Sequence, residues 1–214
     1  MRRMLAACLI VIGTSTAALA AGPREAVQAS VERVVAILME IDLSQPPSKE
    51  SRATARTHVA ERRDEIRQIA AEMFDFEEIS RRALSSHWAS LTPTERAEFV
   101  RLFTETLERM YLGRLEDYSG ERFVWVGETV DGEFAAVRSK VVFKRGDTPL
   151  EYRLRLRDDR WRVYDLAVEG MSLVGMYRSQ FDRIIRMESF DGLLERLRKR
   201  NFETAAAGPA AQGL

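Results

Sequence analysis

The sequence predicts an α+β fold in which a four-stranded antiparallel sheet packs against several helices. Apolar residues recur at helical spacing before residue 119 and again after residue 172, and the segment between them has the shorter period of β-strands. Short connections such as Asp131-Gly132 join these strands, which is typical of an antiparallel meander. Helices first, strands next and helices last is the order expected when helices cover one side of a sheet.

Four helices are expected ahead of the strands, each from an apolar stripe at spacings of three and four residues. They span residues 26–41, 49–73, 76–84 and 93–118. Asp75 is placed to cap the third helix. The fourth begins at Thr92-Pro93-Thr94-Glu95, a capping box with proline at the first helical position. This box is the clearest local signal in the chain, and it predicts a well-defined helix start.

Four strands are expected at residues 121–128, 133–145, 150–157 and 161–169. In the third, apolar residues alternate strictly with charged ones, which predicts one buried and one solvent-facing side. The fourth is apolar at nearly every position from Tyr164 to Val168, with Asp165 as the exception. Apolar cover on both of its faces is therefore expected there.

The segment from Trp161 to Ile185 is the centre of the predicted fold, because it carries a strand, a turn and a helix. Gly170 can adopt the positive φ that a sharp turn needs, and Ser172 can cap the helix that follows. A last helix is expected from Gly192 to Arg200. Residues 204–214 have too little apolar bulk to pack and are expected to be disordered.

The first twenty residues have the features of a secretory signal peptide. Arg2 and Arg3 precede an apolar run, and Ala18-Leu19-Ala20 matches an A-x-A cleavage site. Cleavage after Ala20 leaves one α+β domain at residues 21–203 and removes Cys8, the only cysteine. Since the chain has 33 basic and 33 acidic residues, loss of the two arginines gives the mature chain a net charge of −2. This balance gives no indication of nucleic-acid binding.

Signatures of enzymes are scarce. The sequence has no GxGxxG, P-loop, HExxH or GxSxG motif. His58 and His87 fall on different elements, which favours packed or solvated histidines over a catalytic pair. Asp165 lies in an otherwise apolar run. Its favoured role is an ion pair or backbone hydrogen bonds at the sheet edge, and the alternative is contact with a polar group of a ligand.

Six blocks occur in order along the chain: FDFEEISRRAL, HWASLTPTERAEFVRLF, YLGRLEDYSGE, YDLAVEGMSLV, YRSQF and DGLLERLRK. Together they resemble the MlaC family of periplasmic phospholipid-binding proteins, which serve an ABC-type lipid transport system in Gram-negative bacteria. The resemblance covers residues 26–200. None of the blocks is a catalytic signature.

The resemblance implies a protein that holds the acyl chains of a phospholipid between the sheet and the helices, with the head group near solvent. It implies a periplasmic shuttle that maintains outer-membrane lipid asymmetry, with phospholipid as cargo and without a cofactor or a metal. The implied partners are an inner-membrane ABC transporter complex, with its membrane-anchored substrate-binding subunit, and an outer-membrane lipoprotein complex. The residues expected to line the acyl-chain pocket are Leu107, Tyr111, Leu115, Val137, Val141, Leu154, Tyr164, Leu166, Val168, Met171, Val174 and Phe181.

Two other interpretations of the residues stay open. The broad apolar faces of the helix at 93–118, the strand at 161–169 and the helix at 172–186 are also compatible with a solid core, as in an adaptor protein without lipid. A small periplasmic α+β enzyme that uses Asp165 as an acid–base group is the second alternative.

Overall fold

The computed structural model describes residues 21–39, 49–115, 118–144 and 146–199. The predicted signal peptide and the predicted C-terminal tail lie outside the described residues, and so do the side chains of residues 49–58, 114 and 115. The elements in chain order are α1 (Pro23–Met39), α2 (Lys49–Met73), α3 (Phe76–Leu84), the 3-10 helix η1 (Ser85–Ser90), α4 (Pro93–Leu115), β1 (Arg122–Asp131), β2 (Phe134–Phe143), β3 (Gly146–Arg157), β4 (Arg160–Val168), β5 (Met171–Ser172), α5 (Leu173–Glu188) and α6 (Phe190–Arg198).

The strands form an antiparallel meander in the order β1-β2-β3-β4-β5, which confirms the α+β fold. The predicted count of four strands is wrong by one, because β5 adds a short fifth strand. Glu169 and Gly170 both have positive φ, at 51° and 81°. A two-residue turn of this kind suits the twist of the flanking strands. It places Met171 opposite Val168.

The helix starts follow the predicted caps. Thr92 Oγ1 accepts a hydrogen bond from Glu95 N at 3.3 Å, and Thr92 N donates to the Glu95 carboxylate at 2.7 Å, so the capping box is confirmed. Asp75 caps α3 and Ser172 caps α5, each by accepting from the backbone N–H three residues on. The last helix begins slightly earlier than predicted, because Ser189 has a φ of 88° and caps α6.

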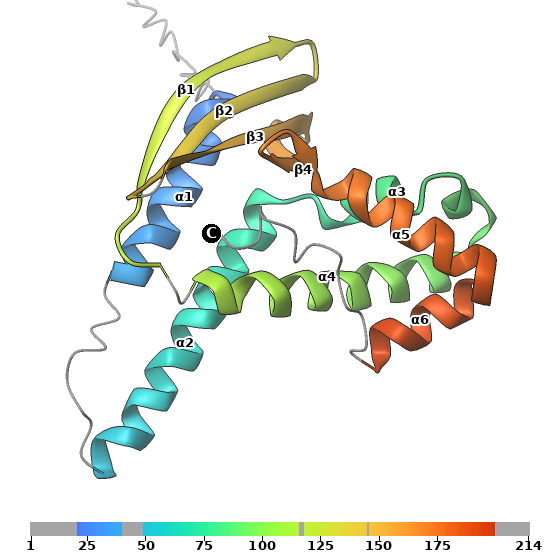
Figure 1. Cartoon of the computed structure of the whole chain (residues 1–214), viewed down its shortest axis with the longest axis horizontal. Helices are drawn as coiled ribbons and strands as arrows, with labels where there is room; N and C mark the ends of the chain where they lie inside the picture. The colour runs from blue at the N-terminus through green and yellow to red at the C-terminus, as the bar shows by residue number, and fades with distance from the viewer. Residues whose placement is uncertain (1–20, 40–48, 116–117, 145, 200–214) are drawn as a thin grey trace, which may run out of the picture.

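Figure 1 shows the curved sheet above α1 and α2, with α3, α5 and α6 gathered around one end of α4. Three apolar clusters fill this arrangement. The helical cluster joins α3, α4, α5 and α6 around Phe99, Phe103 and Phe181. The sheet cluster covers the inner face of the sheet together with Val27 of α1. The third cluster lies where α1 and α2 cross, around Leu38 and Ile69. The three clusters leave a hollow between them.

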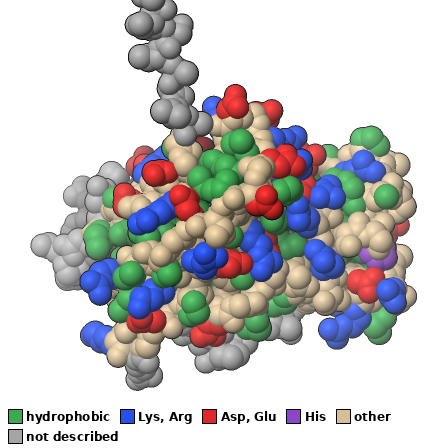
Figure 2. Space-filling model, turned by 90° about the horizontal axis from the view of Figure 1, so that it is seen from above, with side chains coloured by type: hydrophobic (Ala, Val, Ile, Leu, Met, Phe, Trp, Pro, Cys, Tyr) green, Lys and Arg blue, Asp and Glu red, His purple; other side chains and the backbone are tan. Residues whose placement is uncertain are grey.

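The outer face of the sheet is mostly polar, as the alternation in β3 predicts. Figure 2, seen from above, shows positive and negative side chains interspersed on this face of the molecule. Lys140 pairs with Asp147 at 2.5 Å, and Arg153 pairs with Glu151 at 3.0 Å. Exposed pairs of this kind contribute about 0–1 kcal/mol each to folding, so they favour solubility more than stability.

Candidate functional site

An apolar cavity of about 330 Å³ lies where the three clusters meet. Its walls come from α1, α2, α3, α4, the start of α5 and the inner face of the sheet. The lining includes Val31, Val34, Leu38, Ile69, Met73, Phe103, Leu107, Tyr111, Phe123, Val141, Leu150, Tyr152, Leu166, Val168 and Val174. A concave, mostly apolar site with few polar groups is typical of a binding pocket for a small molecule.

The pairing of the strands shows that the cavity lies at one end of the inner face of the sheet. Leu150 of β3 lies opposite Val168 of β4, and both line the cavity. Further along the sheet, Leu154 lies opposite Val163, and both are fully buried in the sheet cluster. The inner face therefore passes from a solid core at one end to a cavity at the other.

Six of the twelve predicted pocket residues meet at this cavity: Leu107, Tyr111, Val141, Leu166, Val168 and Val174. Val137 and Leu154 are fully buried in the sheet cluster and do not line the cavity, although Val137 lies opposite Tyr152, which does. Phe181 packs edge-on against Phe99 and Phe103 inside the helical cluster. The side chain of Leu115 lies outside the described residues.

Tyr164 and Met171 are corrections to the predicted lining. In the pairing of β3 with β4, Arg153 lies opposite Asp165 and Leu154 opposite Val163, so Tyr164 has no partner and forms a β-bulge. A bulge shifts the alternation by one residue. Tyr164 therefore faces away from the cavity, where its ring lies 3.9 Å from the Arg82 guanidinium carbon and edge-on to Phe134.

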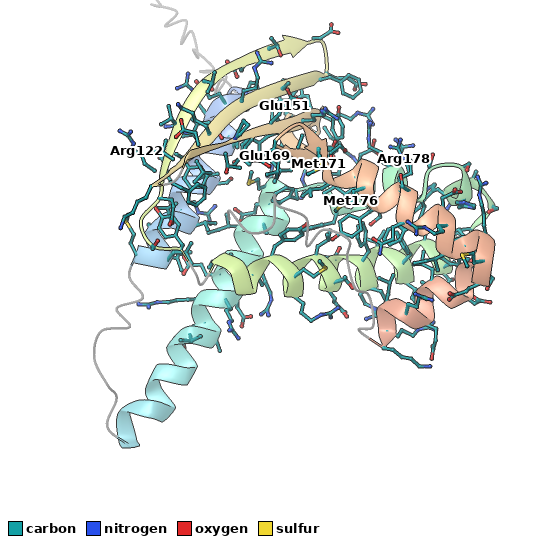
Figure 3. All side chains as sticks on the ribbon, in the orientation of Figure 1. Arg122, Glu151, Glu169, Met171, Met176 and Arg178 are labelled. Carbon is teal, nitrogen blue, oxygen red and sulfur yellow. The ribbon has the colours of Figure 1, made fainter. Side chains whose placement is uncertain are left out.

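Met171 follows the turn and is 53% exposed. Figure 3 shows it beside Glu169, at the junction of β4 with α5. The expected apolar cover on both faces of β4 is thus incomplete. On the outer side, an arginine and an aromatic ring cover Tyr164.

Sequence reasoning missed the walls that α1 and α2 contribute. Val31, Val34, Val35 and Leu38 come from α1, and Ile66, Ile69, Ala70 and Met73 come from α2. Both apolar stripes are visible in the sequence at helical spacing. The signal was present, but the stripe alone does not show whether a helix packs on a solid core or on a cavity.

Asp165 is the buried acid at the sheet end of the cavity, and its bonds are structural. It is 4% exposed, and its carboxylate accepts hydrogen bonds from Ser172 Oγ at 2.6 Å and from Val174 N at 3.1 Å. It also pairs with Arg153 at 3.0 Å. A carboxylate at a helix N-terminus is favourable. Asp165 therefore joins β4, β3 and the start of α5, in line with the favoured interpretation.

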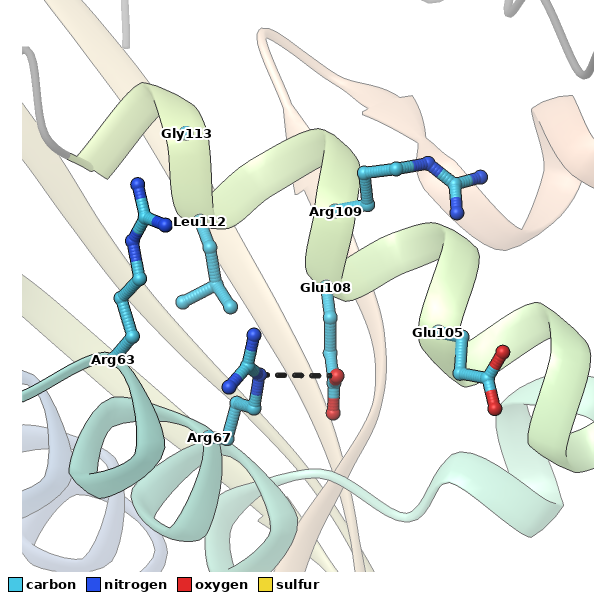
Figure 4. A pocket seen from close by; sticks show the side chains of 7 residues that line it. All are labelled: Arg63, Arg67, Glu105, Glu108, Arg109, Leu112 and Gly113. Carbon is cyan, nitrogen blue, oxygen red and sulfur yellow. Dashed lines mark ion pairs between the residues drawn. The ribbon is translucent and has the colours of Figure 1, made fainter. Parts of the chain in front are cut away.

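Other polar groups at the cavity are neutral or lie at its rim. Burial raises the pKa of the Tyr152 hydroxyl to about 12, so it stays protonated. At the rim, Arg67 pairs with Glu108 at 3.4 Å across α2 and α4. Burial raises the pKa of Glu108 although Arg67 acts in the opposite direction. Figure 4 shows this pair in a polar pocket that adjoins the cavity.

His87 is the only histidine with a described side chain. Its Nε2 lies 3.0 Å from Asp182, and this contact is the main cause that lowers the pKa of Asp182. The pair lies on the helical side, away from the residues that line the cavity. Among the residues that the structure describes, no group of acids and histidines has the arrangement of a metal site. No helix within them is long and apolar enough to cross a membrane.

An apolar cavity between an antiparallel sheet and helices, with charged residues at its rim, has the features of a binding pocket for an apolar small molecule. The chain belongs to the MlaC family, whose model, described as "MlaC protein", matches residues 48–199.

Two relatives support the assignment. The intermembrane phospholipid transport system binding protein MlaC of Haemophilus influenzae is 23% identical over 124 residues, and the toluene tolerance protein ttg2D of Pseudomonas putida is 26% identical over 121 residues. The matches cover 55% of this chain in each case, and 58% and 56% of those relatives, so the chain spans little more than half of their length.

The fold is also similar to a solved structure, the phospholipid-binding protein of Ralstonia solanacearum in complex with a phospholipid. The TM-score is 0.70 at 24% sequence identity, and the match covers 85% of this chain and 97% of that one. The two chains share a fold along most of their length.

Proposed function

We propose that this protein is a periplasmic carrier that holds phospholipid in the cavity between the sheet and the helices. The observation that carries the proposal is the cavity itself, which takes its walls from all three apolar clusters. The Haemophilus influenzae relative is named as a phospholipid transport system binding protein, and the Ralstonia structure holds a phospholipid, which supports the same ligand class.

The energetics suit a carrier. An acyl chain in water costs about 0.8 kcal/mol for each methylene group. A two-chain lipid therefore crosses an aqueous compartment too slowly without a protein around its chains. Since the lipid starts buried in a membrane, transfer into an apolar cavity is close to an exchange of one apolar environment for another. The direction of transport then comes from partners.

We also propose the compartment in which the protein acts and the complexes with which it exchanges lipid. The predicted signal peptide directs the chain to the periplasm. There it exchanges lipid with an inner-membrane ABC transporter complex and an outer-membrane lipoprotein complex, and so maintains outer-membrane lipid asymmetry. Family membership supports this part of the proposal.

Native mass spectrometry of protein purified from the periplasm without detergent tests the ligand. The expected result is a mature chain that begins at Ala21 and carries phospholipid, identified by its fragment ions after extraction. A chain that never carries lipid, and takes none up from vesicles, would contradict the proposal and favour a solid-core adaptor. Turnover of a substrate that depends on Asp165 would favour the small enzyme.

A further inference from the structure

A second pocket, of about 390 Å³, lies between α2 and α4. We call it the rim pocket. Its charged lining consists of Arg63, Arg67, Arg109, Glu105 and Glu108. We infer that the rim pocket binds the phosphodiester of a glycerophospholipid, with Arg67 and Arg109 as its phosphate ligands. This inference rests on the proposed function, because it takes the acyl chains to occupy the apolar cavity.

The rim pocket and the apolar cavity share a wall. Arg67, Glu108 and Leu112 line both of them. In Figure 4, Arg63 and Arg67 extend from α2 toward α4, which carries Leu112 and Glu108. A ligand with an apolar body and an anionic end can therefore occupy both pockets at once. The wall that they share is where the glycerol backbone of such a lipid would lie.

Arg67 has N–H donors that its ion pairs leave unused and that a phosphate can accept. A guanidinium carries five N–H donors. Arg67 directs Nε to Glu108 at 3.4 Å and Nη1 to Asp64, so other N–H groups stay available. The contact with Glu108 is longer than the usual 2.7–2.9 Å of a charge-assisted hydrogen bond. A phosphate oxygen at ordinary distance would therefore compete well with Glu108 for this guanidinium.

Arg109 is the second ligand, although in Figure 4 its exposed side chain extends away from Arg67 and has to turn toward it to bind the same phosphate. Arg109 Nη2 donates a 3.5 Å hydrogen bond to Thr106 Oγ1, and within the described part of the chain no carboxylate lies at ion-pair distance from it. Glu105, the acid one turn away, pairs with Arg101 at 2.7 Å. Planar guanidinium groups match phosphate oxygens in geometry and charge. The rim pocket thus has a surplus of positive charge where a phosphodiester would lie.

Binding of two lipids with the same acyl chains tests the inference. Phosphatidylglycerol carries the phosphodiester and diacylglycerol lacks it. Delipidated wild-type protein should prefer phosphatidylglycerol by about tenfold, the effect of two partly solvated charge-assisted contacts. The double variant Arg67→Gln/Arg109→Gln should lose this preference and bind the two lipids with similar affinity. Arg186→Gln is the matched control, because this arginine is 74% exposed on α5, outside both pockets, and should keep the preference.

Ionic strength supplies an independent readout. Screening should reduce the preference of the wild type as salt rises and leave diacylglycerol binding unchanged. Inorganic phosphate at the concentration of the lipid should not displace phosphatidylglycerol, since the acyl chains tether the head group.

Equal binding of the two lipids by the wild type would overturn the inference and leave the proposed function intact. A preference for phosphatidylglycerol that survives in the double variant would also overturn the inference and leave the proposed function intact. Displacement of phosphatidylglycerol by equimolar inorganic phosphate would contradict a head group that is held in place by its acyl chains. Failure of the wild type to bind either lipid would overturn the proposed function and this inference together.

Discussion

Replacing Val168 or Val174 by a larger side chain tests whether the core beside them is hollow or solid. They are 2% and 5% exposed, and both line the apolar cavity. In Val168→Trp or Val174→Trp, the indole should occupy space that an acyl chain would otherwise fill. We expect the delipidated variants to be nearly as stable as the wild type in urea, with much less bound lipid by native mass spectrometry.

Val137→Trp is the control for this test. Val137 is fully buried in the filled part of the same sheet, so a tryptophan there should overpack the core and destabilise by about 1–3 kcal/mol. All variants must be compared without lipid, because bound ligand adds stability by mass action. Equal destabilisation at Val168 and Val137 would show that the cavity wall behaves as solid core.

Glu78 gives a pH-dependent prediction. It is 7% exposed in α3; burial acts to raise the pKa of its carboxyl, but hydrogen bonds from Arg81 and Arg82 outweigh this, so the pKa falls below its ordinary 4.5. A carboxyl group whose pKa is lower in the folded than in the unfolded protein stabilises the fold at pH values above its unfolded pKa. This stabilisation is lost as the pH falls through the folded pKa. Glu78→Gln should therefore destabilise by roughly 1–3 kcal/mol at pH 7.

The difference between Glu78→Gln and the wild type should shrink as pH falls below 4.5. Urea denaturation across this range measures it. A difference that stays constant down to low pH would show that the carboxylate charge contributes nothing.

The start of α4 is the element whose contribution is easiest to isolate. Thr92→Ala removes the side-chain oxygen that accepts from Glu95 N, and we expect a loss of about 1 kcal/mol of stability. Thr92→Ser keeps the oxygen and should retain most of that stability. The bound lipids should not change in either variant, because Thr92 is outside both pockets. An altered lipid profile at unchanged stability would contradict this assignment.

The same elements show which features the sequence could predict. Caps at Asp75, Thr92 and Ser172 depend on contacts over three residues, so their residue types predict them. The β-bulge at Tyr164 depends on pairing with β3, and period-two extrapolation from Leu166 places Tyr164 on the wrong face. Whether Val137 meets a cavity or a filled core depends on helices that are distant in sequence. A valine is equally hydrophobic in both places, so its residue type does not distinguish them.

At the scale of the whole molecule, the cavity is small for the proposed cargo. Its volume of about 330 Å³ is near the lower end of the range for ligand pockets, roughly 300–1,000 Å³. The proposed two-chain lipid needs more space than this, so we expect one wall to move outward when it binds. The helices α3, α4, α5 and α6 share a tight aromatic cluster and are poor candidates. The wall opposite them is formed by α1 and α2.

We expect α1 to be the wall that moves, because much of its apolar stripe faces the cavity and its polar contacts to neighbouring elements are exposed. Arg24 N donates to Glu128 at 3.0 Å, and Arg33 pairs with Glu72 at 2.7 Å with both side chains more than half exposed. Such pairs are weak. The buried residues of α1 are Pro23, Val27, Ile37 and Leu38, and Leu38 itself lines the cavity. Lipid in the cavity would add apolar contacts to this helix.

Hydrogen–deuterium exchange measures the effect. Amides of α1 should exchange more slowly in lipid-loaded than in delipidated protein, and by a larger factor than amides of α6, which does not line the cavity. Arg33→Gln, which removes an exposed ion pair, should speed exchange of α1 in the delipidated protein and leave α6 unchanged. Lipid loading that slowed α1 and α6 by the same factor would indicate only global stabilisation, and the moving wall would then have to be sought at α2 or the sheet.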